Sequence, residues 1–338
     1  MKKSNSIWMV LLLLASCRQD TFVPDGKERY PVGFSLPEIE VLSRAAAEDA
    51  LVAGNTLTIA AYDPDTKVMA GQGRYTVASG TGGLTLETEH PLYLSAGTYD
   101  FCTMFPGDGL SADGSHLTIA AGVDAKGSVT RAQMLPQPTL IALNKLRHLA
   151  SQISFTVRVV TATSPITTFD VKKIVVDGMV SAGANNYKLP ENEWVMPDVF
   201  NGNLTIDNKD GDLFTYLADA PAGKNGKHYN TQNTPLVIFP RPADTFEAVI
   251  TLNVGEEGKS AVERTVKATI NNLAFEPGKR YLFEVNYGWD FVSFTVTVAT
   301  WNPVDNNQGT VGSGEQEIEH IFTIAGSWVD VSLGGEIG

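Results

Sequence analysis

Short runs of alternating apolar and polar residues, each ended by turn-forming residues, recur through most of the chain. The run at 56–62 stops at Asp63-Pro64, and the run at 98–105 stops at Pro106-Gly107. A period of two places successive side chains on opposite faces of a strand, and Pro and Gly favour tight turns between antiparallel neighbours. The pattern therefore predicts an all-β chain of antiparallel strands. We expect strands at 56–62, 83–87, 91–94, 98–105, 116–120, 152–160, 171–176, 203–206, 235–239, 246–254, 261–270, 281–285 and 291–298.

One stretch interrupts this pattern. Residues 139–150 read as a short helix or a linker, and a strong strand is predicted directly after them. We therefore place a domain boundary near residue 145. This gives an N-terminal β-sandwich domain at 33–145 and a C-terminal one at 146–338, and a chain of 338 residues is long enough for two such cores.

The N-terminus has the features of an export signal. Met1-Lys2-Lys3 is positively charged, and an apolar run at 7–14 leads into Ala15-Ser16-Cys17. The run is too short to cross a bilayer as a helix. Residues 1–16 are therefore predicted to be a lipoprotein signal peptide, with Cys17 looking like the lipidated (palmitate-type) cysteine of a bacterial lipobox. The alternative is an ordinary signal peptide followed by a chance cysteine.

The stretch after Cys17 is polar and rich in Pro and Gly. Residues 17–32 therefore suit a tether between a lipid anchor and the fold. The mature chain is therefore expected to be exported and tethered to a membrane, with the membrane lipid as one partner. A net charge of −13 argues against nucleic acid as a partner, because phosphate binding needs basic surfaces.

The residue types that usually carry chemistry are sparse. Cys102 lies alone in an apolar run and is expected to be buried, as is His148. The five histidines lack metal-ligand spacing, and no nucleotide-binding or hydrolase motif occurs. The acidic stretch at 207–212 fails the calcium-loop register and is predicted to be a polar hairpin turn. We expect no catalytic residue, metal or cofactor, although paired carboxylates stay open because their pairing is three-dimensional.

Five local features occur in a fixed order along the chain. They are the lipobox with its polar spacer, Leu94–Phe101 with its Gly-Thr-Tyr, the segment 146–157, the Pro-Gly-Lys segment 273–285, and a strand ending at Trp301. In this order they resemble the fimbrillins of Bacteroidetes, the major and minor pilins and their relatives. The features are architectural, since Pro-Gly forms a turn and the aromatic residues fill a sandwich.

This resemblance implies two transthyretin-like β-sandwich domains in tandem. It also implies a pilus subunit that is exported as a lipoprotein to the outer membrane and cell surface. A trypsin-like protease would then mature it by cutting after an arginine. The bond between Arg44 and Ala45 has the most suitable surroundings, because small alanines follow it. The alternative is that Arg44 is an ordinary loop residue, and Arg18, Arg29 and Arg74 are rival cleavage positions.

Cleavage would remove a strand, expected at 34–42. An exposed groove with unpaired backbone groups is a template for a strand of another chain. We expect the donor in the tail 315–338, which follows a flexible break at 309–314. The alternative is that the tail completes the C-terminal sheet. The apolar donor residues are Ile318, Phe322 and Ile324 in one run, and Val329, Val331 and Leu333 in the next.

Two functions compete at this stage. The first is a structural stalk pilin that supports adhesion, whose partners are copies of itself or sibling pilins. The second is a surface-anchored lipoprotein or tip adhesin that binds a host protein or glycan and does not form the stalk. For the second, Trp194, Tyr187 and Tyr229 could stack on sugars, although they could equally pack the surrounding loops.

Overall fold

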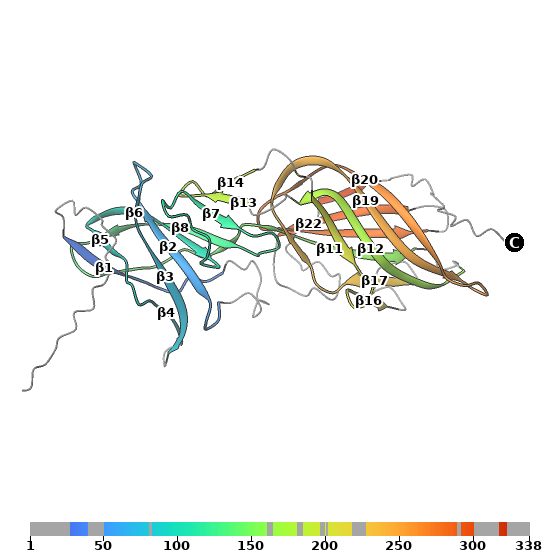
Figure 1. The fold of residues 1–338 in the computed structure, drawn as a ribbon, viewed down its shortest axis with the longest axis horizontal. Coiled ribbons are helices and arrows are strands. Elements are labelled where there is room, and N and C mark those ends of the chain that lie inside the picture. Colours follow the sequence, from blue (N-terminus) through green and yellow to red (C-terminus); the bar gives the residue numbers. More distant parts are fainter. Residues whose placement is uncertain are drawn as a thin grey trace, which may run out of the picture.

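The computed structural model describes residues 28–39, 51–80, 83–160, 165–180, 185–196, 200, 202–217, 228–288, 292–300 and 318–322. Every regular element in these ranges is a β-strand. Most neighbouring strands pair antiparallel, which confirms the predicted all-β class. No helix long and apolar enough to cross a membrane occurs among these residues. The strands form two groups that follow one another along the long axis of Figure 1.

The first group is a sandwich of two sheets. A three-stranded sheet has the order β5 (Tyr93–Ser95), β1 (Arg29–Phe34) and β9 (Thr139–Ile141). Side chains of both sheets share one hydrophobic core, which includes Phe34, Tyr75 and Phe101. The larger, six-stranded sheet has the order β10 (Arg147–His148), β8 (Lys126–Met134), β6 (Gly97–Phe105), β2 (Thr56–Tyr62), β3 (Met69–Gly80) and β4 (Gly83–Glu87).

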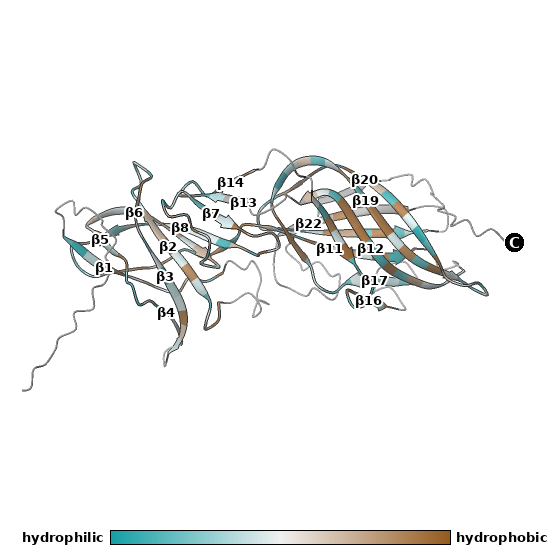
Figure 2. Cartoon of the chain, in the orientation of Figure 1, coloured by the Kyte–Doolittle hydropathy of each residue, from teal (hydrophilic) through white to brown (hydrophobic). Residues whose placement is uncertain are grey.

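The second group is also a sandwich of two sheets over one core. Figure 2 shows apolar residues along β11 and β12, whose buried side chains help to fill this core. One sheet has the order β15 (Gly202–Asp207), β12 (Ile166–Val180), β19 (Arg241–Glu256) and β20 (Val262–Phe275). The other has the order β16 (Phe214–Leu217), β17 (Tyr229–Gln232), β11 (Ser151–Val159), β21 (Lys279–Tyr287), β22 (Val292–Thr300) and β23 (Ile318–Phe322), with β18 (Leu236–Ile238) also pairing β11.

A small third sheet joins distant parts of the chain. β7 (His116–Ile119) pairs with β13 (Asn185–Lys188), and β13 pairs with β14 (Glu193–Val195). The core beneath it combines Tyr62 and Cys102 of the first group with Phe239 from the second half of the sequence. The two groups of strands are therefore connected by packing as well as by the chain.

Two sequence predictions differ from the structure. The helical alternative for residues 139–150 is wrong, because β9 and β10 lie there. Leu140 contributed to the apolar pattern that suggested a helix, but its side chain is 73% exposed. Its backbone pairs with β1, more than a hundred residues earlier, and no local pattern indicates such a distant partner. β1 also begins at Arg29, inside the stretch 17–32 that was expected to be a tether. The signal peptide 1–16 lies outside the described residues.

Candidate functional site

Strand β1 lies in the middle of its sheet. It pairs antiparallel with β5, where Tyr30 faces Leu94, and parallel with β9, where Gly33 faces Leu140. Beyond these ladders, the Val32 N–H donates to the Leu92 carbonyl at 2.9 Å. Both backbone edges of β1 are thus in use, although this strand comes from the extreme start of the described chain.

The inward side chains of β1 fill the first sandwich. Val32 and Phe34 are 3% and 8% exposed. The Phe34 ring lies edge-on to Tyr75, with centroids 5.3 Å apart, and to Phe101 at 5.4 Å. Further along, Ile39 is buried in a cluster with Leu51, Leu57, Val77 and Leu146. The apolar side chains of segment 32–39 therefore fill part of the core.

Polar contacts fix the segment that follows β1. The Ser35 N–H donates to the Ile141 carbonyl at 2.9 Å, and the Ser35 hydroxyl accepts from the Leu143 N–H at 3.2 Å. The Glu38 carbonyl accepts from the Leu146 N–H at 2.7 Å. The Glu38 carboxylate lies 2.7 Å from the Lys145 ammonium, which lowers the pKa of this exposed acid.

The predicted cleavage position, Arg44-Ala45, lies outside the described residues, as does Cys17. Ile39 before this position and Leu51 after it are both buried in the same hydrophobic cluster. Two of the rival arginines are in paired strands: Arg29 opens β1, and Arg74 lies in β3.

The tail is described only in part. β23 pairs antiparallel with β22, with Val298 opposite Ile318 and Phe294 opposite Phe322. For this run, the backbone therefore follows the alternative that the tail completes the C-terminal sheet. The other donor residues lie outside the described residues: Ile324, Val329, Val331 and Leu333.

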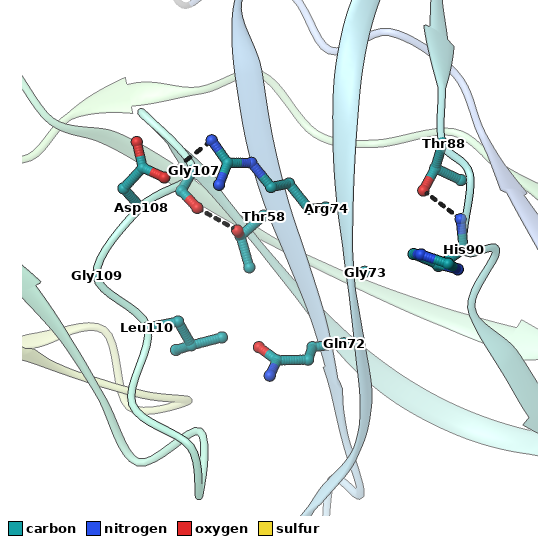
Figure 3. Close-up of a pocket in the computed structure, with 10 residues that line it drawn as sticks. All are labelled: Thr58, Gln72, Gly73, Arg74, Thr88, His90, Gly107, Asp108, Gly109 and Leu110. Carbon is teal, nitrogen blue, oxygen red and sulfur yellow. Dashed lines mark hydrogen bonds and ion pairs between the residues drawn. The ribbon is translucent and has the colours of Figure 1, made fainter. Parts of the chain in front are cut away.

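A polar hollow of about 350 Å³ lies on the six-stranded sheet (Figure 3). Arg74 reaches from β3 to Asp108, where the ion pair measures 2.9 Å. Thr58 donates to the Gly107 carbonyl at 2.5 Å and holds the loop against β2. Gly107 is required there, because a Cβ would lie 2.6 Å from the Leu57 backbone. The charged groups here pair with each other, and no cluster of three metal-ligating side chains occurs in the described part of the chain.

A larger cleft, of about 960 Å³, lies between the two groups of strands. Three cationic side chains line it, those of Lys145, Arg147 and Lys279, and its lining contains no carboxylate among the described residues. His148 also lines it, with Nδ1 2.8 Å from the Asp124 carboxylate. Lys145 is paired with the Glu38 carboxylate at 2.7 Å, so part of this positive charge is already neutralised.

The aromatic residues proposed for sugar stacking serve packing instead. Tyr187 and Tyr229 are buried. Trp194 is half-buried, its Nε1 donates to the Leu149 carbonyl at 2.8 Å, and its ring centroid lies 4.9 Å from that of Phe239. The packing alternative is confirmed, and these residues do not form an exposed sugar platform.

The remaining candidates also have structural surroundings. Cys102 is fully buried, and burial raises the pKa of its thiol to about 12, so it is not a thiolate nucleophile near neutral pH. In the polar turn at 207–212, Asn208 donates to the Val171 carbonyl and accepts from the Leu213 N–H. A turn is present, but it is not the predicted hairpin, because β15 pairs with β12 and β16 pairs with β17. The strand expected at 34–42 has the wrong bounds: β1 ends at Phe34, residues 35–38 lie outside any strand, and Ile39 forms only an isolated bridge. The start of β1 was missed because Arg29-Tyr30-Pro31 carries no clear alternation.

Residues 65–308 match the model of a family described as fimbrillin-like. The match covers well over half of the chain, so this protein belongs to the fimbrillin-like family. That membership supports a pilin-like, non-enzymatic role in a cell-surface fimbrium, in association with sibling subunits. No curated protein matches the sequence.

Solved structures share the fold. A fimbrial protein from Bacteroides vulgatus ATCC 8482 has a TM-score of 0.57 at 11% identity, with 81% of this chain and 100% of that chain covered. A candidate cell adhesion protein from Bacteroides ovatus ATCC 8483 has a TM-score of 0.51 at 12% identity, covering 82% and 99%. One from Parabacteroides distasonis ATCC 8503 also scores 0.51 at 12% identity, covering 82% and 100%. At these identities the likeness establishes the fold alone.

Proposed function

We propose that this protein is a stalk subunit of a bacterial surface fimbria. It is exported as a lipoprotein with Cys17 acylated, cut after Arg44, and polymerised by donor-strand exchange. Its two sandwiches are proposed to be transthyretin-like domains in tandem, divided near residue 145. Membership of the fimbrillin-like family supports the pilin role.

The central position of β1 is the observation that carries this proposal. An edge strand that leaves a sheet exposes one row of backbone groups, but a central strand that leaves exposes two. Loss of β1 would free the edges of both β5 and β9. A strand from another subunit could then form hydrogen bonds on both sides and place alternate side chains into the core.

Loss of β1 removes buried side chains from the core, so the remaining sandwich needs a replacement strand. Val32, Phe34 and Ile39 are each buried, and burial of such a side chain contributes about 1.5–3 kcal/mol. Together they contribute roughly 5–9 kcal/mol, which is comparable with the whole stability of a typical domain. A sandwich without β1 would therefore be marginal until another strand occupies the groove.

The position of the proposed cut fits this scheme. A protease needs an accessible, extended substrate, which Arg29 and Arg74 do not offer because their backbones are paired in sheets. Cleavage after Arg44 would release segment 32–39 and would also separate the subunit from Cys17. The precursor thus keeps its lipid anchor and has β1 in the groove, whereas the cut subunit has no lipid and an empty groove.

Trypsin treatment of the full-length protein tests the proposal. We expect a cut after Arg44, followed by ladders that resist sodium dodecyl sulfate. Arg44→Ala should prevent the cut and the ladders, whereas the control Arg29→Ala should not. Deletion of residues 315–338 should permit the cut but abolish the ladders. Ladders that persist without the tail would contradict donor-strand exchange through it.

The basic cleft favours a second candidate, a surface protein that binds an anionic glycan. Its three cations, Lys145, Arg147 and Lys279, are of the type that binds carboxylate or sulfate groups, and Lys145 would exchange its Glu38 partner for the ligand. Retention of uncut protein on a sulfated glycan column, lost when the three cations are replaced by Ala, would support this role. Such retention without ladders after trypsin would favour it over the stalk.

A further inference from the structure

The three-stranded sheet of the first sandwich is apolar on its outward face as well as on its core face. Tyr93 of β5 lies opposite Pro31 of β1, and Gly33 of β1 lies opposite Leu140 of β9. Partners in a ladder share a face, and so do residues two apart, so these four positions are on one face. Tyr93 is 49% exposed and Leu140 is 73% exposed, which places this face on the solvent side.

Two exposed prolines extend this face. Pro91 and Pro138 lie two residues before Tyr93 and Leu140, which is the spacing of positions on one side of an extended chain. The β5 ladder continues in this direction, because the Leu92 carbonyl accepts a hydrogen bond from β1. None of the six positions carries a charged side chain. We call them the outer patch: Pro31, Gly33, Pro91, Tyr93, Pro138 and Leu140.

The outer patch departs from the usual composition of a solvated sheet face. A sheet that packs on one side normally presents polar side chains on the other. β3 of the facing sheet follows this rule, since its exposed positions are Gln72, Arg74 and Thr76. Contiguous apolar residues on a surface indicate an interaction site. The outer patch is therefore expected to contact something other than water.

The size of the outer patch argues against a second protein as its partner. β5 and β9 have three residues each, and strands lie about 4.8 Å apart with a rise of about 3.3 Å per residue. The face therefore measures roughly 10 by 15 Å, or about 150 Å². A stable protein interface needs about 800 Å² on each partner. A lipid bilayer has no such requirement, because a few apolar side chains can enter it without a matching surface.

We propose that the outer patch docks on the lipid bilayer to which the uncut chain is tethered. This inference rests on the lipid anchor at Cys17 in the proposed function and adds a second membrane contact to it. Residues 18–28 separate Cys17 from Arg29, where β1 begins. Even fully extended, this length of chain spans no more than about 40 Å. The strand at the centre of the outer patch is thus held close to the bilayer surface.

The tether makes a weak contact effective. Leu140 can enter the acyl region, and Tyr93 is of the residue type that favours the level of the lipid headgroups. Two such side chains bind a free protein only weakly. A short linker, however, gives the tethered patch an effective concentration in the millimolar range. A second contact also makes anchoring by lipid more stable than one acyl chain alone.

The position of the outer patch connects docking to maturation. β1 and β5 lie at the end of the first group of strands that is remote from the second group (Figure 1). Docking there does not require the second sandwich to touch the bilayer. Because β1 supplies Pro31 and Gly33, the proposed cut after Arg44 removes the lipid anchor and the centre of the outer patch together. The uncut chain therefore has two membrane contacts, and the cut subunit has neither.

Fluorescence quenching on vesicles tests the docking. Uncut protein that begins at Cys17 is coupled through this cysteine to a maleimide lipid in phosphatidylcholine vesicles whose acyl chains carry bromine. Cys102 is buried and does not compete for the coupling. Tyr93→Trp adds a fluorescent reporter to the outer patch and keeps an aromatic ring there. We expect bromine to quench the added fluorescence by about half or more, since the tether keeps most copies docked.

Two further variants make the test specific. Val262→Trp is the matched reporter, because Val262 is 50% exposed but lies in β20 of the second sandwich, and its fluorescence should not be quenched. Addition of Leu140→Asp to Tyr93→Trp should lower the ratio of docked to undocked protein at least about tenfold, because an apolar side chain is lost from the bilayer and a charge is added. Vesicles that contain anionic phosphatidylglycerol should weaken the docking, since the chain has a net charge of −13.

The possible outcomes separate this inference from the proposed function. An unquenched Tyr93→Trp reporter, or equal quenching of both reporters, overturns docking through the outer patch. Dimers of the uncut protein in solution that Leu140→Asp abolishes would assign the patch to a second copy and also overturn it. If ladders still form after trypsin, the stalk remains supported. A native precursor whose mass shows no lipid on Cys17 contradicts the proposed function, whereas the coupled vesicles still measure the patch.

Discussion

The Phe34 ring meets the Phe101 ring edge-on, with centroids 5.4 Å apart and planes inclined at 71°. Phe34 belongs to β1, and Phe101 lies in the centre of β6 in the facing sheet. This contact joins the segment proposed to leave during maturation to the part of the sandwich that stays. Its loss should therefore affect the precursor and the polymer differently.

The first prediction concerns Phe34→Ala. Truncation of a buried Phe typically costs about 3–5 kcal/mol, because it leaves a cavity. We expect a loss of this size in the unfolding free energy of the uncut protein, measured in urea. The mature polymer, which lacks this residue, should unfold as the wild type does. Leu140→Ala on neighbouring β9 is the control, and its exposed side chain should matter little. A polymer weakened by Phe34→Ala would show that β1 is still present.

The second prediction concerns the ion pair between Asp100 and Arg131. The guanidinium donates to both carboxylate oxygens, at 2.7 and 2.9 Å, and lowers the pKa of this buried carboxyl below its ordinary 3.8. Because the folded-state pKa is depressed, the stabilisation is complete above the ordinary pKa and is lost as pH falls through the folded-state value. Asp100→Asn should cost about 1–2 kcal/mol at pH 7 and much less at pH 2–3.

Urea unfolding at several pH values measures this difference. Asp108→Asn is the matched control, because the Asp108–Arg74 pair is exposed on both sides and exposed pairs contribute little. An Asp100→Asn variant whose deficit stays constant down to pH 2 would contradict the electrostatic explanation.

The third prediction concerns the reactivity of Cys102. Burial raises the pKa of its thiol to about 12, and the thiolate is the reactive form. In the protein cut after Arg44, which lacks Cys17, we expect almost no labelling by a thiol reagent at pH 8 until the protein is unfolded. Cys102 faces the core beneath β7 and β13 rather than the groove of β1, so the cut should not expose it. Rapid labelling after the cut would show that removal of β1 loosens the whole sandwich.

The fourth prediction concerns the junction at Trp194. Its indole packs on Phe239 and Tyr187 and donates to Leu149, which joins the small sheet to the first sandwich. Trp194→Ala should lower stability by about 2–4 kcal/mol. It should also divide a single calorimetric transition into two. Trp194→Phe, which retains the ring contacts, should keep one transition, and two transitions in the wild type would contradict coupling through this residue.

The sequence predicts strands well where turn residues bracket a clear alternation. β2 and β6 are of this kind, since each stops at a Pro-containing turn. β3 was not predicted, because three glycines dilute its alternation although Tyr75 and Val77 are buried. β13 is short and polar, and its partner β7 lies far upstream, so no local pattern indicates it.

The candidate site was predictable to the same degree. A removable strand was expected at 34–42, but β1 spans Arg29–Phe34 and residues 35–38 lie outside any strand, although Phe34 and Ile39 are buried. The pairing of β1 on both sides could not be predicted, because β5 and β9 lie far along the sequence and one pairs antiparallel, the other parallel. Register between such distant strands depends on tertiary packing rather than on local pattern.

Mass spectrometry of purified polymer subunits tests the central claim most directly. If β1 leaves during assembly, every subunit should begin at Ala45, and no fragment that contains residues 28–39 should remain bound after the polymer is denatured. Polymers whose subunits retain Val32, Phe34 and Ile39, either in one chain or as a bound fragment, would contradict strand replacement.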